Sequence, residues 1–105
     1  MISRNTFAEM VTPVTKVTFK DNNGKSVDTG DAEDGLGHFV HRTRDGRVLL
    51  FHSGGNPGAL AYFIVEPTGG NGLCAVVNSD NGSPVLIDIL AAWAASRQVD
   101  LPVLF

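Results

Sequence analysis

Apolar residues near both ends of the chain recur at helical spacing. The first helix is expected from Ser3 to Met10, with Ser3 as its N-cap, and Thr12-Pro13 ends it. The second is expected to begin near Ser83, again as N-cap, with a proline in its first turn. It carries one apolar stripe: Val85, Leu86, Ile89, Leu90 and Trp93. Such a stripe packs against other elements, so we expect this C-terminal helix to lie on one face of a sheet.

Between the two helices the pattern predicts strands. Val14 to Phe19 alternates apolar and polar residues, as an edge strand does. Four further strand segments follow along the chain: Gly35 to Thr43, Arg47 to His52, Ala59 to Glu66 and Leu73 to Asn78. The turn Arg44-Asp45-Gly46 joins the first two of these, because an Asp-Gly pair tolerates positive φ. The last two are apolar at both odd and even positions, which predicts that both of their faces are covered.

The stretch 20–34 is the most polar part of the chain. It holds five carboxylates and the turn signal Asn23-Gly24, so we expect a mobile surface loop. The carboxylates lack the regular spacing of a calcium-binding loop. With no linker or internal repeat, residues 1–105 are expected to form a single α+β domain. Its expected architecture is an antiparallel meander of about four to five strands, with the C-terminal helix packed on one face and a short N-terminal helix.

Charge and cysteine content narrow the classes of function. The formal charge of −3, from 8 basic and 11 acidic residues, argues against a nucleic-acid or membrane-surface partner. Arg42, Arg44 and Arg47 surround a turn and are expected to form a solvated hairpin tip. The single cysteine, Cys74, lies in an apolar run, where a thiol is expected to be a small buried residue. No signal peptide or transmembrane-length segment is visible, so the default location is the cytoplasm.

Candidate chemistry is concentrated between Phe51 and Gly58, which bring one imidazole, one hydroxyl and three glycines into eight residues. The candidate ligand-site residues are His52, Ser53, Gly54, Gly55 and Asn56. Consecutive strand residues point to opposite faces, so His52 should not reach the hydroxyl of Ser53 without a bulge. His38 and His41 would also face opposite sides of a strand, which spoils them as a metal pair. No metal or cofactor is expected.

Four motifs occur in a consistent order: Gly35-Leu36-Gly37-His38-Phe39-Val40, His52-Ser53-Gly54-Gly55-Asn56-Pro57-Gly58, Tyr62-Phe63-Ile64-Val65-Glu66-Pro67 and Val76-Val77-Asn78-Ser79-Asp80-Asn81-Gly82. Together they resemble the C-terminal part of the serine β-lactamase-like hydrolases, a superfamily of class C β-lactamases, penicillin-binding proteins and related esterases. The opening segment 2–13 looks like the family's last helix before this region. By resemblance, His52 would give electrostatic or proton-transfer help, Ser53 would hydrogen-bond the substrate, and the N–H of Gly55 would be one arm of an oxyanion hole.

The family's nucleophile has no match in the chain. Its Ser-x-x-Lys motif and its Tyr-x-Asn or Ser-x-Asn motif both lie upstream of the matched region. The stretches starting at Ser3, Ser26 and Ser79 have no Lys at the required spacing, and the only tyrosine, Tyr62, is followed by Phe63-Ile64. Two strands that complete the family's sheet also have no counterpart. We therefore expect an exposed edge, a partly uncovered apolar face and a homodimer.

These observations lead to two main hypotheses. The preferred one is a free-standing, non-catalytic remnant of such a hydrolase that self-associates or binds a ligand, and the initial Met1 favours an independent chain. The alternative is one part of a split serine hydrolase for β-lactams or esters, completed by another chain that carries the nucleophile. A third is a cleft near His52 and Asn56 that binds a small carboxylate or ester without turnover. Many relatives in the family are exported, so export stands beside the cytoplasmic default.

Overall fold

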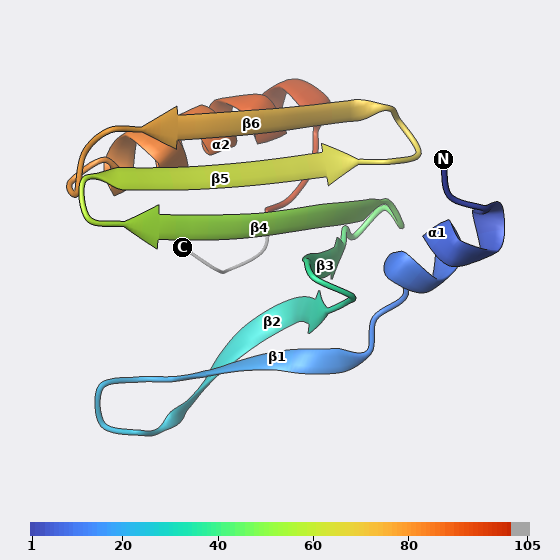
Figure 1. Cartoon of the computed structure of the whole chain (residues 1–105), viewed down its shortest axis with the longest axis horizontal. Helices are drawn as coiled ribbons and strands as arrows, with labels where there is room; N and C mark the ends of the chain where they lie inside the picture. Colours follow the sequence, from blue (N-terminus) through green and yellow to red (C-terminus); the bar gives the residue numbers. More distant parts are fainter. Residues whose placement is uncertain (102–105) are drawn as a thin grey trace.

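A computed structural model describes residues 1–101, with the backbone alone for 17–19 and 27–32. The elements are α1 (Arg4–Met10), β1 (Thr15–Lys20), β2 (Ser26–Asp34), β3 (Phe39–Arg42), β4 (Val48–Asn56), β5 (Ala59–Glu66), β6 (Asn71–Val77) and α2 (Ser83–Arg97). The six strands form one antiparallel sheet in chain order, and α2 lies along one of its faces (Figure 1). The predicted α+β meander is confirmed, with one strand more than expected.

The additional strand, β2, lies in the stretch that the sequence predicts to be a loop. The side chain of Asp21 accepts hydrogen bonds from the backbone N–H groups of Asn23 and Lys25, both at 2.9 Å. These bonds close a tight turn, so Ser26–Asp34 returns along β1 as its antiparallel neighbour. The loop prediction for 20–34 is therefore wrong from residue 26 onward. Backbone pairing needs no apolar pattern once a local turn has brought two segments together.

The two helices begin at different kinds of cap. In α1 the side chain of Ser3 accepts a hydrogen bond from the N–H of Thr6 at 3.1 Å, so the predicted N-cap is confirmed. In α2 the N-cap is Gly82, which makes no side-chain cap bond, and Ser83 is the first helical residue. The predicted serine cap of α2 is wrong by one position. This shift leaves the hydroxyl-bearing side chain of Ser83 in the first turn of the helix.

The core lies between α2 and the central strands. Its buried members are Leu49, Phe51, Tyr62, Ile64 and Leu90. Of the predicted α2 stripe, Leu86 and Leu90 are buried and Trp93 packs against the core, whereas Val85 and Ile89 are 52% and 38% exposed. Five residues at these positions span about 140° of the helix circumference, which is wider than the strip that meets the sheet.

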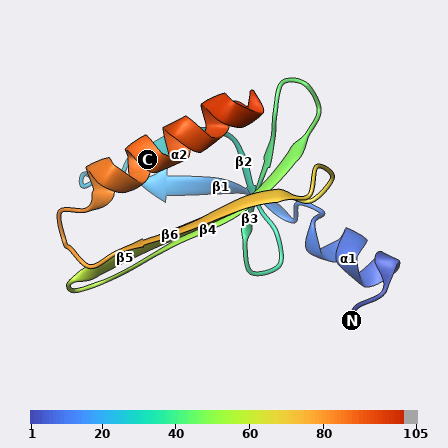
Figure 2. The ribbon, with the colours of Figure 1, turned by 90° about the horizontal axis from the view of Figure 1, so that it is seen from above.

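The face of the sheet opposite α2 is only partly covered, so the prediction that both faces of β5 and β6 are covered is wrong. Phe63 is 37% and Val76 is 68% exposed there, and Cys74 is exposed rather than buried. The face is open because α2 covers the other side (Figure 2). The expected uncovered apolar face is therefore present.

After α2 the chain turns back toward the core, where Val99 and Leu101 pack. This packing of Leu101 continues the core beyond α2, and residues 102–105 lie outside the described part. Within residues 1–101, neither helix has the length and apolar character needed to cross a membrane.

Candidate functional site

The five candidate residues are consecutive on β4, and the pairing of β4 with β5 assigns each to a face. His52 is opposite Phe63, and Ser53 is opposite the buried Tyr62. Paired residues share a face in an antiparallel sheet. Ser53 and Gly55 therefore lie on the α2 face, whereas His52, Gly54 and Asn56 lie on the other. The predicted site is divided between two faces, and, as predicted, Ser53 and His52 form no dyad.

On the α2 side, β4 and β5 border a cavity of about 400 Å³, here called the α2 cavity. Its lining residues are Ser53, Gly54, Gly55, Leu60, Ala61, Tyr62, Ser83, Leu86 and Ile87. The lining combines three hydroxyl side chains with apolar ones, and none of its described residues is charged at neutral pH. Burial raises the pKa of the Tyr62 hydroxyl, so this group stays protonated at physiological pH. The cavity can offer hydrogen bonds to a ligand oxygen but no base strong enough to activate a serine.

The His52 ring lies between two aromatic rings: Phe63, its cross-strand partner on the face opposite α2, and Phe39, which pairs with Phe51 and also packs against the core. The His52 ring centroid is 5.3 Å from that of Phe39 and 6.5 Å from that of Phe63, with interplanar angles of 6° and 14°. A shallower hollow of about 250 Å³ lies here, and its lining includes His52, Phe63 and Cys74. Ser53 and Tyr62 border this hollow as well as the α2 cavity. The exposed imidazole lies against aromatic rings, and the alternation along β4 directs it to the face opposite the Ser53 side chain.

One backbone edge of the candidate stretch is open. β5 pairs with one edge of β4, and β3 pairs with the other edge only at Val48–Phe51. Along His52–Asn56 no described strand pairs with the edge of β4 that faces away from β5. In an antiparallel strand every second residue directs its N–H and C=O groups toward each edge. This stretch, with its two consecutive glycines, thus presents backbone donors and acceptors directly beside the α2 cavity.

The tip of the β4–β5 hairpin is tied to the start of α2. Asn56 pairs with Ala59 across a Pro57-Gly58 turn, and Gly58 has the positive φ of 80° that such a turn requires. The N–H of Gly58 donates to Asp80 at 2.6 Å. In the same connection the side chain of Ser79 accepts from the N–H two residues later, at 3.1 Å. Asp80 and Ser79 thus make turn contacts, which fix one end of the α2 cavity.

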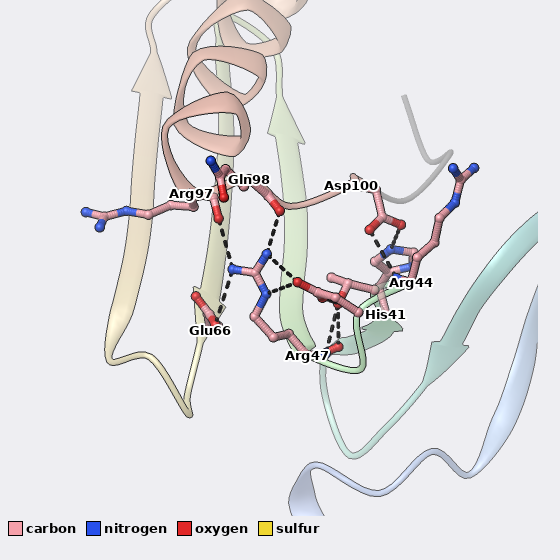
Figure 3. Close-up of polar contacts among 9 residues, drawn as sticks. His41, Arg44, Arg47, Glu66, Arg97, Gln98 and Asp100 are labelled. Carbon is pink, nitrogen blue, oxygen red and sulfur yellow. Dashed lines mark hydrogen bonds and ion pairs between the residues drawn. The ribbon is translucent and has the colours of Figure 1, made fainter.

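The side chain of Arg47, which the sequence predicts to be solvated, contacts several other segments (Figure 3). Its guanidinium donates to the carbonyl oxygen of Arg97 at 2.9 Å and to that of Gln98, and its Nε–H donates to Asp45 at 2.9 Å. It also lies 3.7 Å from the buried carboxylate of Glu66. The solvated-tip prediction is wrong for Arg47, because the partners come from the end of α2 and from β5. Arg42 and Arg44 are exposed.

A second polar contact, beside Arg47, holds the segment that follows α2 (Figure 3). The side chain of Asp100 lies 3.3 Å from Nε2 of the buried His41 and accepts from the N–H of Arg44 at 3.2 Å. Burial alone would raise the pKa of Asp100, but these hydrogen bonds hold it below its usual value. Both contacts dock the C-terminal segment on the β3–β4 hairpin, so their role is structural.

The Asp45 carboxyl gives a pH-dependence prediction. Hydrogen bonds from Arg47 and from the Thr43 hydroxyl lower its pKa from 3.8 to about 2. A carboxyl whose pKa falls on folding stabilises the fold above its unfolded pKa, and this contribution is lost as pH falls from 3.8 toward about 2. Over this range the urea midpoint of the wild type should therefore fall more steeply than that of Asp45→Asn. Asp88→Asn, at an exposed position on α2, should follow the wild type. Equal slopes for wild type and Asp45→Asn would contradict the prediction.

No His, Cys, Asp and Glu side chains in the described part of the chain gather in a group of three that would hold a metal ion. Comparison with protein-family models, with curated proteins and with solved structures finds no match to this chain. The resemblance to the β-lactamase-like hydrolases therefore depends on its motifs alone.

Proposed function

We propose that this chain is a non-catalytic remnant of a β-lactamase-like serine hydrolase that binds a small ester or carboxylate and self-associates. The observation that carries the proposal is the open backbone edge of His52–Asn56 beside the α2 cavity. An open strand edge supplies fixed N–H donors to a ligand oxygen, and glycines permit close approach. The hydroxyls of Ser53 and Ser83 add donors on the cavity side. The resemblance agrees, since in that family the matching strand contacts the substrate.

The surroundings of Ser53 support binding without turnover. A serine becomes nucleophilic when a base lies within hydrogen-bond reach of its hydroxyl. Among residues 1–101 the lining of the α2 cavity includes no His, Asp, Glu or Lys, and His52 belongs to the other face of β4. Because its pKa is raised, the Tyr62 hydroxyl stays protonated at neutral pH and cannot act as a general base. A bound ester would therefore be held and released intact.

The ligand-binding proposal predicts a localised response to methyl benzoate and, in a separate titration, to benzoate. In two-dimensional ¹H–¹⁵N NMR spectra, amide shifts should centre on Ser53–Asn56 and on the first turn of α2. Ser53→Ala should weaken binding by about threefold or more, because one hydroxyl hydrogen bond is lost. The matched control is Ser96→Ala, about 20 Å further along α2, which should leave the affinity unchanged.

Two outcomes of this experiment would contradict the proposal. The first is that neither titration shifts any amide signal. The second is that Ser53→Ala gives the same shifts and the same affinity as the wild type. Either result would exclude the α2 cavity as the binding site. The same samples treated with a fluorophosphonate or a β-lactam should keep their intact mass. A stoichiometric adduct that disappears in Ser53→Ala or His52→Ala would exclude the non-catalytic function.

A second candidate function is one part of a split serine hydrolase. It is favoured by the exposed apolar surface around His52, Phe63 and Cys74. A second chain that binds this surface would contact the imidazole of His52. The missing Ser-x-x-Lys motif would then come from that chain. An adduct with a β-lactam that forms only after such a chain is added would favour this function over the first.

A further inference from the structure

The two edge strands of the sheet differ in how well they are protected against pairing with another sheet. β1 carries Lys16 and Lys20, and its register with β2 shifts between Lys16 and Thr18. Charged residues and bulges of this kind discourage edge-to-edge association. β6 has no charged residue and no proline, and it pairs with β5 without interruption from Asn71 to Val77. The edge at β6 is therefore uncharged and regular along its whole length.

This edge is also accessible. Within residues 1–101, no strand pairs with β6 on the side away from β5. Figure 2 views the sheet from the β6 side and shows α2 set off to one side of the strand. The outward N–H and C=O groups of β6 are thus available to another strand.

The flank of α2 beside this edge is apolar. Ile87 lines the α2 cavity with residues of β4 and β5, so its side of the helix faces β4. The opposite flank, on the β6 side, carries Val85, Ile89 and Ala92 at positions i, i+4 and i+7. All three are exposed, Val85 and Ile89 by 52% and 38%. A chain that pairs with β6 would therefore also meet an apolar helix flank.

We propose that β6 pairs in antiparallel orientation with β6 of a second copy, around a two-fold axis beside Cys74. This inference rests on the self-association in the proposed function and assigns its surface. Cys74 is the middle residue of the seven in β6, so centring the axis there pairs the full strand and places Asn71 opposite Val77 of the second copy. The two six-stranded sheets become one continuous sheet of twelve strands, with both α2 helices on the same face.

A second copy fits both features of this surface at once. A two-fold contact is self-complementary, so the same edge and the same flank serve both copies. The uncharged strand meets an uncharged strand, which avoids the like-charge pairs that destabilise cross-strand contacts. The apolar flanks with Val85 and Ile89 approach each other over the joined strands and are withdrawn from water.

The symmetry places the only cysteine of the chain opposite itself. Directly paired residues in antiparallel strands have Cα atoms about 4.5–5.5 Å apart, within the range that a disulfide spans. Cys74 is exposed, so an oxidant can reach it. With copper(II)-phenanthroline as electron acceptor, each thiol gives up one proton and one electron, and an S–S bond forms between the copies. The wild type should therefore give a covalent dimer that a thiol reductant reverses.

The control moves the thiol by two residues. In Cys74→Ser/Val76→Cys the cysteine stays on the same exposed face of β6. In the proposed register, position 76 faces position 72, so the two thiols lie about 13 Å apart along the strands. Cross-linking of this variant should be at least about tenfold lower, with circular dichroism confirming that it is folded. Equal cross-linking of the two forms would overturn the proposed register.

A charge exchange at the axis tests the interface without oxidation. Cys74→Lys alone and Cys74→Glu alone place like charges opposite each other and should each raise the dimer dissociation constant by about fivefold or more. An equimolar mixture should recover association as mixed dimers, measured by sedimentation equilibrium. If both variants dimerise with the dissociation constant of the wild type, the β6 edge is not the interface, although the protein still self-associates. A wild type that is monomeric at millimolar concentration, or that associates only with a different chain, would overturn both.

Discussion

Leu90→Ala should lower the free energy of unfolding by about 3 kcal/mol, a large share of the total for a domain of this size. Leu90 is 1% exposed and connects α2 to a core that includes Phe51 and Ile64 on the sheet. Removing its three distal carbons forfeits their burial and leaves a cavity between helix and strands that two rigid elements cannot fully close. The anchoring of α2, and with it the wall of the α2 cavity, depends on this side chain.

Urea unfolding followed by the fluorescence of Trp93, the only tryptophan, provides the measurement, because this residue packs against the same core. The matched control is Ile87→Ala, three positions earlier on α2, where the side chain is 42% exposed. It should lose less than about 1 kcal/mol. Similar losses for the two variants would mean that α2 does not pack through its Leu90 side.

Gly82→Ala should cost about 2 kcal/mol, although alanine is ordinarily the better residue in a helix. A Cβ at Gly82 would lie 2.2 Å from Cγ2 and 3.0 Å from Cβ of Val77, so β6 or the start of α2 must move. The matched control is Gly54→Ala, where a Cβ meets nothing within 4 Å. That substitution should be near neutral, since it also restricts the unfolded chain.

A double-mutant cycle separates this clash from a general effect of alanine at the cap. Val77→Ala removes the Cγ2 atom that the new methyl group would strike. Gly82→Ala/Val77→Ala should therefore lose about 1 kcal/mol less than the sum of the two single losses, both measured by urea unfolding. Strict additivity would show that the close contact with Val77 is not the cause.

Features that depend on a few neighbouring residues could be predicted from the sequence. The cap of α1 needs only the Ser3 side chain and the N–H three residues later, and the Asp45-Gly46 turn needs only a residue that tolerates positive φ. The helical spacing of α2 and the alternation in β4 likewise follow from single segments. The pattern does not predict β2, because its polar sequence lacks the apolar alternation of a strand. The strand forms because the local turn at Asp21 directs the chain back along β1.

The environment of particular side chains depended on distant segments. Arg47 and Cys74 lie in stretches that indicate a solvated turn and a buried strand, and both indications are wrong. Arg47 meets Arg97 and Gln98 only because α2 crosses the sheet and ends above it. Cys74 is exposed because its side chain lies on the face of β6 opposite the one that α2 covers.

By itself the sequence determined the two helices, the strands other than β2, and the alternation that separates His52 from Ser53, since these arise from the period of the backbone. Only the tertiary structure decided which face α2 covers, and so which of the two residues lines a cavity and which lies on an open surface. It also decided that β6 ends the sheet with an uncharged edge. The physical reason is that an apolar residue needs some partner to be buried, and the sequence does not say which segment supplies it.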